Sequence, residues 1–195
     1  MKLSILTPAC WERAEQVRKL RDELQSQIAQ VPAFTVEHLV LLDNRTRSVG
    51  LKRQALADAA LGDYIAFVDD DDWIAQDYVP SLLAGIESGA DVITFEQACY
   101  VNGQHGKVVM KLGQKDEVWK PGRTTRRNAW QVCAWKRSIA QQCLFPDMMD
   151  GEDVRWCRQA RHLAQSSHHL PQILHTYRHD AAQTLATGLA APVGS

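Results

Sequence analysis

A run of four carboxylates, Asp69-Asp70-Asp71-Asp72, directly follows the apolar segment YIAFV. Adjacent carboxylates repel one another, so their accumulation requires solvent or a compensating cation. Hard oxygen ligands of this kind suit Mg²⁺ or Mn²⁺, which in turn binds phosphates. Since alternate side chains of an extended segment point the same way, we expect Asp69 and Asp71 to share one metal ion. The alternative is a solvated acidic loop that caps the following helix.

A second acidic cluster could supply acid–base chemistry. Its members are Asp147, Asp150, Glu152 and Asp153, just ahead of the helical stretch VRWCRQARHL. Asp153 can cap that helix, but a cap needs only one acid. A carboxylate within hydrogen-bond reach of a hydroxyl group can remove its proton as the oxygen attacks an electrophile. The cluster therefore contains candidate general bases.

The first half of the chain must position the aspartate run, and its pattern alternates between strands and helices. Short apolar runs predict buried strands at residues 3–6, 38–42, 64–68 and 92–95. Helices are predicted by the spacing of Val17, Leu20, Leu24 and Ile28, by residues 51–60, and by the stretch from Asp77, a candidate cap, to Gly89. This alternation predicts a mostly parallel sheet with helices on both faces, and ligands beyond the carboxyl ends of its strands.

The second half is less regular. Glycines and prolines interrupt residues 99–130, where residues 107–112 can form a strand. We predict helices at 134–143 and 153–163 and a late strand at 174–178. The small-residue tail at 181–195 is expected to be flexible.

Composition sets the broad class of the protein. With 195 residues, 22 basic and 23 acidic, the chain has the size of one domain and almost no net charge. Its five cysteines are scattered without a C-x-x-C pair, so we expect small buried side chains in a reducing compartment. No signal-peptide core and no run of 18 apolar residues is present, so the expected location is cytoplasmic, away from the membrane.

Several segments resemble family 2 glycosyltransferases. The segments are SILTPAC, LVLLDN, SVGLKRQALADAALGDYIAFV, YIAFVDDDDWIAQDYV, FPDMMDGEDVRW and TYRHDAAQT. The resemblance is close over residues 3–87, where it includes the family's Asp-x-Asp motif, and looser beyond. It implies the A-type glycosyltransferase fold, a Rossmann-like α/β sandwich that binds nucleotide-sugars on a mostly parallel central sheet.

The resemblance also implies which residues contact the donor. Asp43 corresponds to the acid that accepts a hydrogen bond from the nucleobase, usually uracil, although the following link NRTRS is shorter than in many members. Asp69 and Asp71 correspond to the acids that hold the ribose and the metal-bound diphosphate. The whole implied set is Thr7, Pro8, Asp43, Lys52, Arg53, Asp69, Asp70, Asp71 and Arg178. For Lys52 and Arg53, the alternative is a pair of exposed helix charges.

Catalytic and metal-binding roles follow from the same resemblance. FPDMMDGEDVRW resembles the family's Glu-Asp motif, whose second acid usually takes the acceptor proton, so Asp153 is favoured over Glu152 as the base. TYRHDAAQT resembles the segment that returns to the metal, which implies His179 as a ligand, with His175 as the alternative. The implied metal ligands are Asp69, Asp71 and His179, and the implied cofactor is Mn²⁺ or Mg²⁺.

We therefore predict a metal-dependent, inverting glycosyltransferase. It would transfer a sugar from a nucleoside-diphosphate sugar, most often a UDP-sugar, to a hydroxyl group of a saccharide, a protein or a hydroxylated nucleobase in DNA. Within a single domain, residues 1–98 would bind the nucleotide-sugar and 99–180 would bind the acceptor and carry out catalysis. The alternatives are a nucleotidyltransferase, whose usual Gly-rich loop after the first strand is missing, and a non-catalytic nucleotide-sugar-binding module.

A basic cluster in the irregular region bears on the acceptor. It combines Arg123, Arg126 and Arg127 with Trp119, Trp130 and Trp135. Stacking of a base or sugar on tryptophan, with arginine on a phosphate, would suit this set. The alternative is a solvated charge run beside core aromatic residues.

Overall fold

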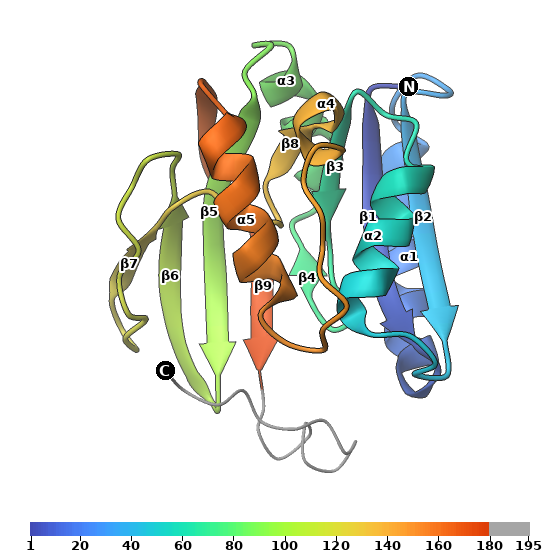
Figure 1. The fold of residues 1–195 in the computed structure, drawn as a ribbon, viewed down its shortest axis with the longest axis horizontal. Coiled ribbons are helices and arrows are strands. Elements are labelled where there is room, and N and C mark those ends of the chain that lie inside the picture. The colour runs from blue at the N-terminus through green and yellow to red at the C-terminus, as the bar shows by residue number, and fades with distance from the viewer. Residues whose placement is uncertain (180–195) are drawn as a thin grey trace.

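A mixed sheet forms the centre of the structure, a computed structural model that describes residues 1–179 (Figure 1). Its strands follow the order β2-β1-β3-β8-β5-β6-β7, and β9 pairs with both β5 and β4. The strands are β1 (Leu3–Cys10), β2 (Val36–Asp43), β3 (Tyr64–Phe67), β4 (Trp73–Ile74), β5 (Val92–Val101), β6 (Gln104–Met110), β7 (Thr124–Arg127), β8 (Ala134–Lys136) and β9 (Ser167–His179). The helices are η1 (Trp11–Arg13), α1 (Ala14–Ile28), α2 (Val49–Ala59), α3 (Tyr78–Ile86), α4 (Arg137–Ala140) and α5 (Glu152–Leu163).

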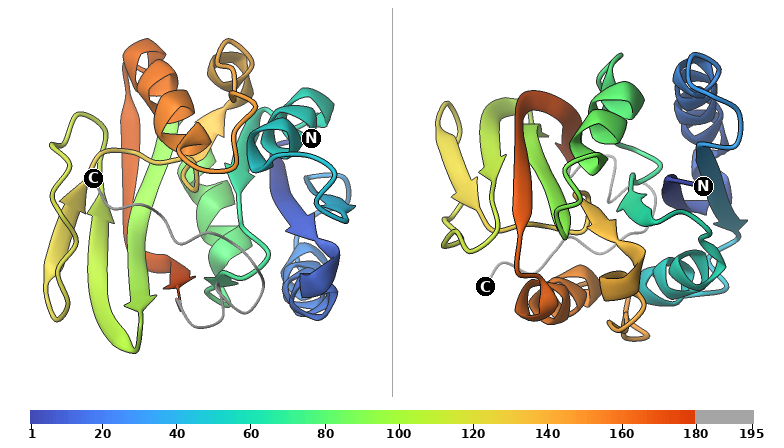
Figure 2. Two further views of the ribbon diagram at one scale, coloured as in Figure 1. Left: turned by 60° about the horizontal axis from the view of Figure 1, so that its bottom comes forward. Right: turned by 90° about the horizontal axis from the view of Figure 1, so that it is seen from above.

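Helices cover both faces of this sheet, which confirms the predicted α/β class (Figure 2). Helices α1 and α3 lie on one face, and α2, α4 and α5 lie on the other. In the first half, β1 pairs in parallel with β2 and with β3, so Cys10 lies opposite Asp43 and Leu6 opposite Phe67. The carboxyl ends of these strands therefore meet at one edge, where the aspartate run begins.

The predicted helix at 134–143 is wrong over its first part. Residues Ala134–Lys136 form β8, which pairs antiparallel with β3 and β5, and helix α4 covers only Arg137–Ala140. Trp135 in β8 is fully buried. The gap between two parallel strands accepts only an extended, fully buried segment, and this pairing overrides the local helical preference.

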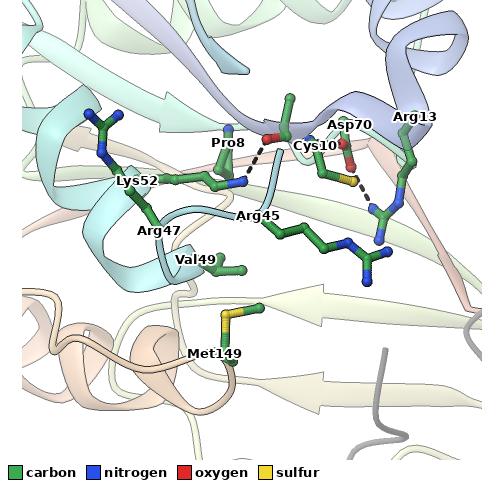
Figure 3. A pocket seen from close by; sticks show the side chains of 10 residues that line it. Pro8, Cys10, Arg13, Arg45, Arg47, Val49, Lys52, Asp70 and Met149 are labelled. Atoms are coloured by element: carbon green, nitrogen blue, oxygen red, sulfur yellow. Dashed lines mark hydrogen bonds and ion pairs between the residues drawn. The ribbon is translucent and has the colours of Figure 1, made fainter. Parts of the chain in front are cut away.

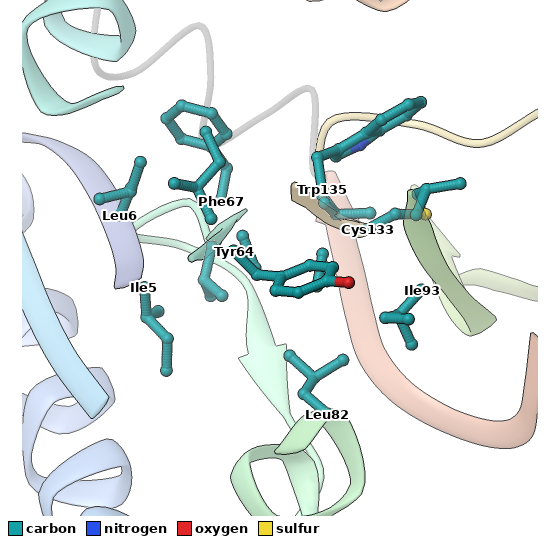
Figure 4. Close-up of a cluster of buried hydrophobic side chains, with 14 of the residues drawn as sticks. Ile5, Leu6, Tyr64, Phe67, Leu82, Ile93, Cys133 and Trp135 are labelled. Carbon is teal, nitrogen blue, oxygen red and sulfur yellow. The ribbon is translucent and has the colours of Figure 1, made fainter. Parts of the chain in front are cut away.

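Aromatic side chains fill the space between the sheet and α5. Phe145 stacks on Trp156 with 5.0 Å between ring centroids, and the edge of Trp135 contacts Trp156 at 5.6 Å. Trp135 and Phe67 belong to the core drawn in Figure 4. All five cysteines are buried and free, as predicted. Over residues 1–179, the structure contains no helix long and apolar enough to cross a bilayer.

Gly50 allows α2 to approach the segment ahead of α5. Its backbone N–H donates to the carbonyl oxygen of Met148 at 3.1 Å. A Cβ atom at this position would lie 1.9 Å from the carbonyl oxygen of Pro146 and 3.3 Å from Cβ of Glu152. Only glycine therefore permits this contact, which places the two acids at the start of α5 next to α2.

We expect Gly50→Ala to destabilise the protein. Alanine in a helix normally stabilises by about 1 kcal/mol relative to glycine, but the overlap with Pro146 forces α2 away from its neighbour at a cost of at least about 2 kcal/mol. Urea unfolding of this variant and of Ala55→Gly, an exposed position on the same helix, checks this. Ala55→Gly should lose about 1 kcal/mol through helix propensity alone, and Gly50→Ala, the reverse change, should lose stability as well. A Gly50→Ala variant as stable as the wild type or more stable would contradict the close packing.

Candidate active site

The aspartate run forms a turn in the structure, so the expectation of an extended segment is wrong. The backbone N–H of Asp72 donates to the carbonyl oxygen of Asp69 at 3.1 Å. Within this turn each carboxylate has a compensating partner, since a buried charge is costly without one, and Asp70 and Asp71 share theirs. Their partners are Arg53 for Asp69, Arg13 and the Cys10 N–H for Asp70, Arg13 for Asp71, and His175 and the Arg178 N–H for Asp72.

Arg53 joins this turn to the second acidic cluster. Its Nη2 donates to Asp69 Oδ2 at 2.9 Å, and its Nε donates to Glu152 Oε1 at 3.1 Å. The guanidinium carbon also lies 5.2 Å from the centre of the Phe67 ring. Arg53 and Lys52 are 3% and 4% exposed, so the alternative of exposed helix charges is wrong for both. Two acidic segments far apart in sequence thus share one buried cation.

The carboxylates of this site are harder to ionise than free ones. Burial and the neighbouring charge of Asp72 raise the pKa of Asp71 to about 7, although Arg13 opposes this shift. Burial likewise raises the pKa of Asp70 and of Glu152, against the lowering effect of Arg13 and Arg53 respectively. Four aspartates and Glu152 lie in this site against two arginines and His175, and this excess of acidic groups favours binding of an additional cation.

The predicted three-ligand metal site is not assembled. Among residues 1–179, no three His, Cys, Asp or Glu side chains converge in a geometry that could hold a metal ion. His179 stacks on Tyr177 with 6.5 Å between ring centroids. Asp69 Oδ1, however, is buried without a hydrogen-bond partner in the described chain. Hard carboxylate oxygens of Asp69 and Asp71 fit Mg²⁺ or Mn²⁺ that completes its coordination with phosphate and water.

A basic pocket opens beside the turn (Figure 3). It lies between the end of β1, the loop before α2 and the segment ahead of α5. Its lining comprises Pro8, Ala9, Cys10, Arg13, Arg45, Arg47, Val49, Lys52, Asp70 and Met149. Four cationic side chains around one pocket, next to excess carboxylates, suit a ligand with anionic groups that can share a metal ion.

Asp43 lies at the end of β2, but its carboxylate is already occupied. Oδ1 pairs with Lys52 Nζ at 2.5 Å and accepts the Arg45 N–H, while Oδ2 accepts from the Thr46 hydroxyl and the Arg47 N–H at 3.0 Å each. These contacts use about as many lone pairs as a carboxylate offers. Asp43 therefore fixes the loop that carries Arg45 and Arg47. A nucleobase can bind the Asp43 carboxylate only by displacing one of these hydrogen-bonding groups.

Thr7 does not belong to the pocket. The residues of β1 that line the pocket are Pro8, Ala9 and Cys10. Thr7 is fully buried, and its hydroxyl lies 3.0 Å from His38 Nε2. The hydroxyl of Thr7 is thus engaged with His38, and its predicted contact with the nucleotide stays a prediction.

Asp153 lies in the first turn of α5 but does not cap it. The N-cap is Gly151, with φ of 77°, and no side chain caps the helix. Asp153 Oδ1 accepts the Val154 N–H at 2.7 Å, and no ion pair within residues 1–179 involves Asp153. The carboxylate of Glu152 forms an ion pair with Arg53, whereas that of Asp153 has no cationic partner among the described residues. Asp77 likewise makes no side-chain cap at α3.

The end of β9 is tied to the turn through Asp72. His175 Nε2 lies 3.2 Å from Asp72 Oδ2, and His175 Nδ1 lies 2.9 Å from Gln97 Nε2. His175 is fully enclosed, which argues against it as the alternative metal ligand. The Arg178 guanidinium lies 4.1 Å from the centre of the Trp73 ring, so it approaches the turn from the outside.

Two of the three arginines in the basic cluster of the irregular region, Arg123 and Arg126, are exposed. Arg127 and Arg161 both contact the Trp130 ring, at 4.2 and 4.9 Å from its centre, and Trp135 is fully buried. Strand β7, which carries Arg126 and Arg127, lies at the opposite end of the sheet order from β2. This favours the alternative of charges beside core aromatic residues.

Comparison of the sequence with protein families gives a match to the glycosyl transferase family 2 over residues 14–143. The chain belongs to glycosyltransferase family 2. The match includes the aspartate turn and Arg53, and it ends before Glu152 and Asp153. No curated protein matches the sequence significantly.

Solved structures of S. aureus TarS share the fold. TarS 1–349 superposes with a TM-score of 0.70 at 16% identity over 91% of this chain and 60% of that one. Its complexes with UDP-GlcNAc and with UDP give TM-scores of 0.70 and 0.72, at 16% and 18% identity. In these two cases 91% of this chain covers 58% and 60% of the TarS chain. The chain thus spans about 60% of the TarS structure, and the comparison confirms the A-type architecture.

We expect Arg53→Met to be strongly destabilising. Removal of the buried cation leaves Asp69 and Glu152 uncompensated, and breaking a buried ion pair costs about 3–5 kcal/mol. Without Arg53 the pKa of Glu152 rises further above its value in the unfolded chain, so the folded variant gains protons and stability as the pH falls from about 8 to 5. Thermal unfolding of the wild type and the variant across this pH range measures how the difference in stability changes with pH. A difference that is the same at every pH would contradict the explanation through uncompensated carboxylates.

Proposed function

We propose that the protein is a metal-dependent, inverting glycosyltransferase that uses a nucleoside-diphosphate sugar, with UDP as the nucleotide. The observation that supports it best is the bridge through Arg53, because it places the aspartate turn beside the start of α5. The aspartate turn and the adjoining basic pocket offer groups for a metal-bound diphosphate, and the start of α5 offers a carboxylate for proton removal. Family membership agrees with this chemistry.

The donor would occupy the basic pocket. Pro8 and Lys52 line this pocket, and Asp43 holds the loop that borders it. Asp43 would contact the nucleobase after the base displaces one of the N–H or O–H groups that now donate to its carboxylate. Asp70 borders it on the side of the turn, and Arg178 approaches the same turn. UDP is the proposed nucleotide because TarS, which shares the fold, was solved with UDP and with UDP-GlcNAc.

Asp69 and Asp71 would hold Mn²⁺ or Mg²⁺ together with the diphosphate. When bound, the cation neutralises the charge that develops on the departing nucleoside diphosphate. The unpartnered Asp69 Oδ1 and the raised pKa of Asp71 support this assignment. His179 stays the proposed third ligand because TYRHDAAQT resembles the family segment that returns to the metal.

Asp153 would act as the general base. Its carboxylate takes the proton of the acceptor hydroxyl as the oxygen forms its bond to the anomeric carbon and the bond from that carbon to the diphosphate breaks. Attack from the face opposite the leaving group inverts the anomeric centre. Glu152 would position Arg53 rather than contact the acceptor, since its carboxylate binds that guanidinium.

The two halves of a single domain would divide these tasks. Residues 1–98 contribute the pocket and the turn, and residues 99–180 contribute Asp153 and the acceptor surface. The acceptor would be a hydroxyl group of a saccharide, a protein or a hydroxylated nucleobase. The predicted flexible tail at 181–195 lies outside the described residues.

We expect Asp153→Asn to retain UDP and Mn²⁺ binding while lowering turnover by at least about 10²-fold, the lower end of general-base contributions. Calorimetry gives the affinity, and hydrolysis or transfer of a labelled UDP-sugar gives the rate. Glu152→Gln is the matched variant, since it tests the neighbouring acid with the same chemical change.

The two variants should differ in kind. Asp153→Asn is expected to fold as stably as the wild type, whereas Glu152→Gln weakens the contact with Arg53 and lowers stability. Wild-type turnover in Asp153→Asn would exclude Asp153 as the base. A catalytic loss confined to Glu152→Gln, at unchanged stability, would assign the role to Glu152 instead.

A further inference from the structure

Arg13 holds two of the four aspartates at once. Its Nη1 lies 2.5 Å from Asp70 Oδ1 and 2.7 Å from Asp71 Oδ2. The Asp70 carboxylate is anchored a second time by the Cys10 N–H at 3.1 Å, whereas no further ion pair or hydrogen bond involves the Asp71 side chain within residues 1–179. Arg13 is therefore the principal positive charge on Asp71.

This contact competes with the proposed function. Asp71 is a proposed metal ligand, and the guanidinium against its Oδ2 atom places a positive charge beside this carboxylate, where it repels a metal cation. Asp71 is also the more exposed of the two partners, with 44% of its side chain accessible against 4% for Asp70. Release of Asp71 is thus easier than release of Asp70, because exposed ion pairs are weaker than buried ones.

Arg13 also faces the proposed donor pocket. It lines the pocket together with Arg45, Arg47 and Lys52, and its side chain comes from η1, a single turn of helix between β1 and α1 (Figure 3). The same guanidinium is therefore within reach of both the metal ligand Asp71 and any phosphate bound in the pocket. Arginine forms strong paired contacts with phosphate as well as with carboxylate.

We propose that Arg13 is an internal counter-cation that occupies Asp71 in the empty enzyme and moves to the diphosphate when the donor binds. This proposal rests on the proposed function. With the site empty, Arg13 compensates the charges of Asp70 and Asp71 and so weakens the binding of a lone divalent cation. A bound diphosphate would attract the guanidinium and release Asp71, which would then be available to hold the metal ion. Arg13 thereby makes metal and nucleotide binding interdependent.

The consequence is a measurable coupling between two ligands. If metal binding requires the state in which Asp71 is free, the apparent metal affinity is reduced by the fraction of molecules in that state. UDP increases this fraction, and by linkage Mn²⁺ increases the affinity for UDP by the same factor. Loss of Arg13 should raise the affinity for Mn²⁺ alone and reduce the coupling.

The test is calorimetric titration of the protein with Mn²⁺ alone, with UDP in the presence of a metal chelator, and with UDP in the presence of Mn²⁺. The proteins are the wild type, Arg13→Gln, Arg13→Lys and Arg18→Gln. Arg18 is the matched control, because it is an exposed arginine on α1 paired with Glu15 and Asp22, away from the turn. Arg13→Gln is expected to bind Mn²⁺ alone about tenfold more tightly than the wild type and UDP alone more weakly. Arg13→Lys keeps a positive charge but not the paired geometry of arginine, so its affinities for Mn²⁺ and for UDP should lie between those of the wild type and Arg13→Gln.

Mn²⁺ affinity that is unchanged or weaker in Arg13→Gln, or a gain matched by Arg18→Gln, would overturn the proposal. If Arg13→Gln does not fold, Arg13→Lys decides on the same criterion. Wild-type protein that binds neither UDP nor UDP with Mn²⁺ would instead refute the proposed function. Wild-type binding with normal coupling in the Arg13 variants would refute only the role of Arg13.

Discussion

The buried guanidinium of Arg53 is the interaction on which the geometry of this site depends. It lies between Asp69 at the end of β3 and Glu152 at the start of α5, against the face of Phe67. Burial of a charge is costly, so such a residue is stable only when both carboxylates are in place. The strand end, α2 and α5 are therefore held in one arrangement, and Gly50 permits the close approach that this arrangement requires.

Electrostatics then explain why the site is suited to a metal-bound diphosphate. Three basic residues, Arg13, Arg53 and His175, contact the four carboxylates of the turn, but the pKa values of Asp70, Asp71 and Asp72 are still raised by burial. The adjoining pocket has the opposite charge. A divalent cation together with a diphosphate would neutralise the charge of both the acidic turn and the basic pocket, whereas either ligand alone would neutralise only one of them.

The sequence allowed prediction of the first half of the fold, because continuous apolar strands and the periodic apolar spacing of helices are determined by local pattern. The same pattern predicts a ligand-binding edge at the end of β3. The strand at Trp135 could not be predicted, since it depends on the gap between β3 and β5. The paired role of Arg53 and the contact of Arg13 with Asp71 were also not predictable, because their partners lie far along the chain and come together only in the folded structure.

The most direct test of this account is anomalous X-ray scattering from crystals grown with UDP and Mn²⁺. The account predicts a manganese peak within coordination distance of Asp69 or Asp71 and of both phosphates, with the nucleotide in the pocket lined by Pro8 and Lys52. Crystals that contain UDP in this pocket without manganese at the turn, or manganese bound away from both aspartates, would contradict it.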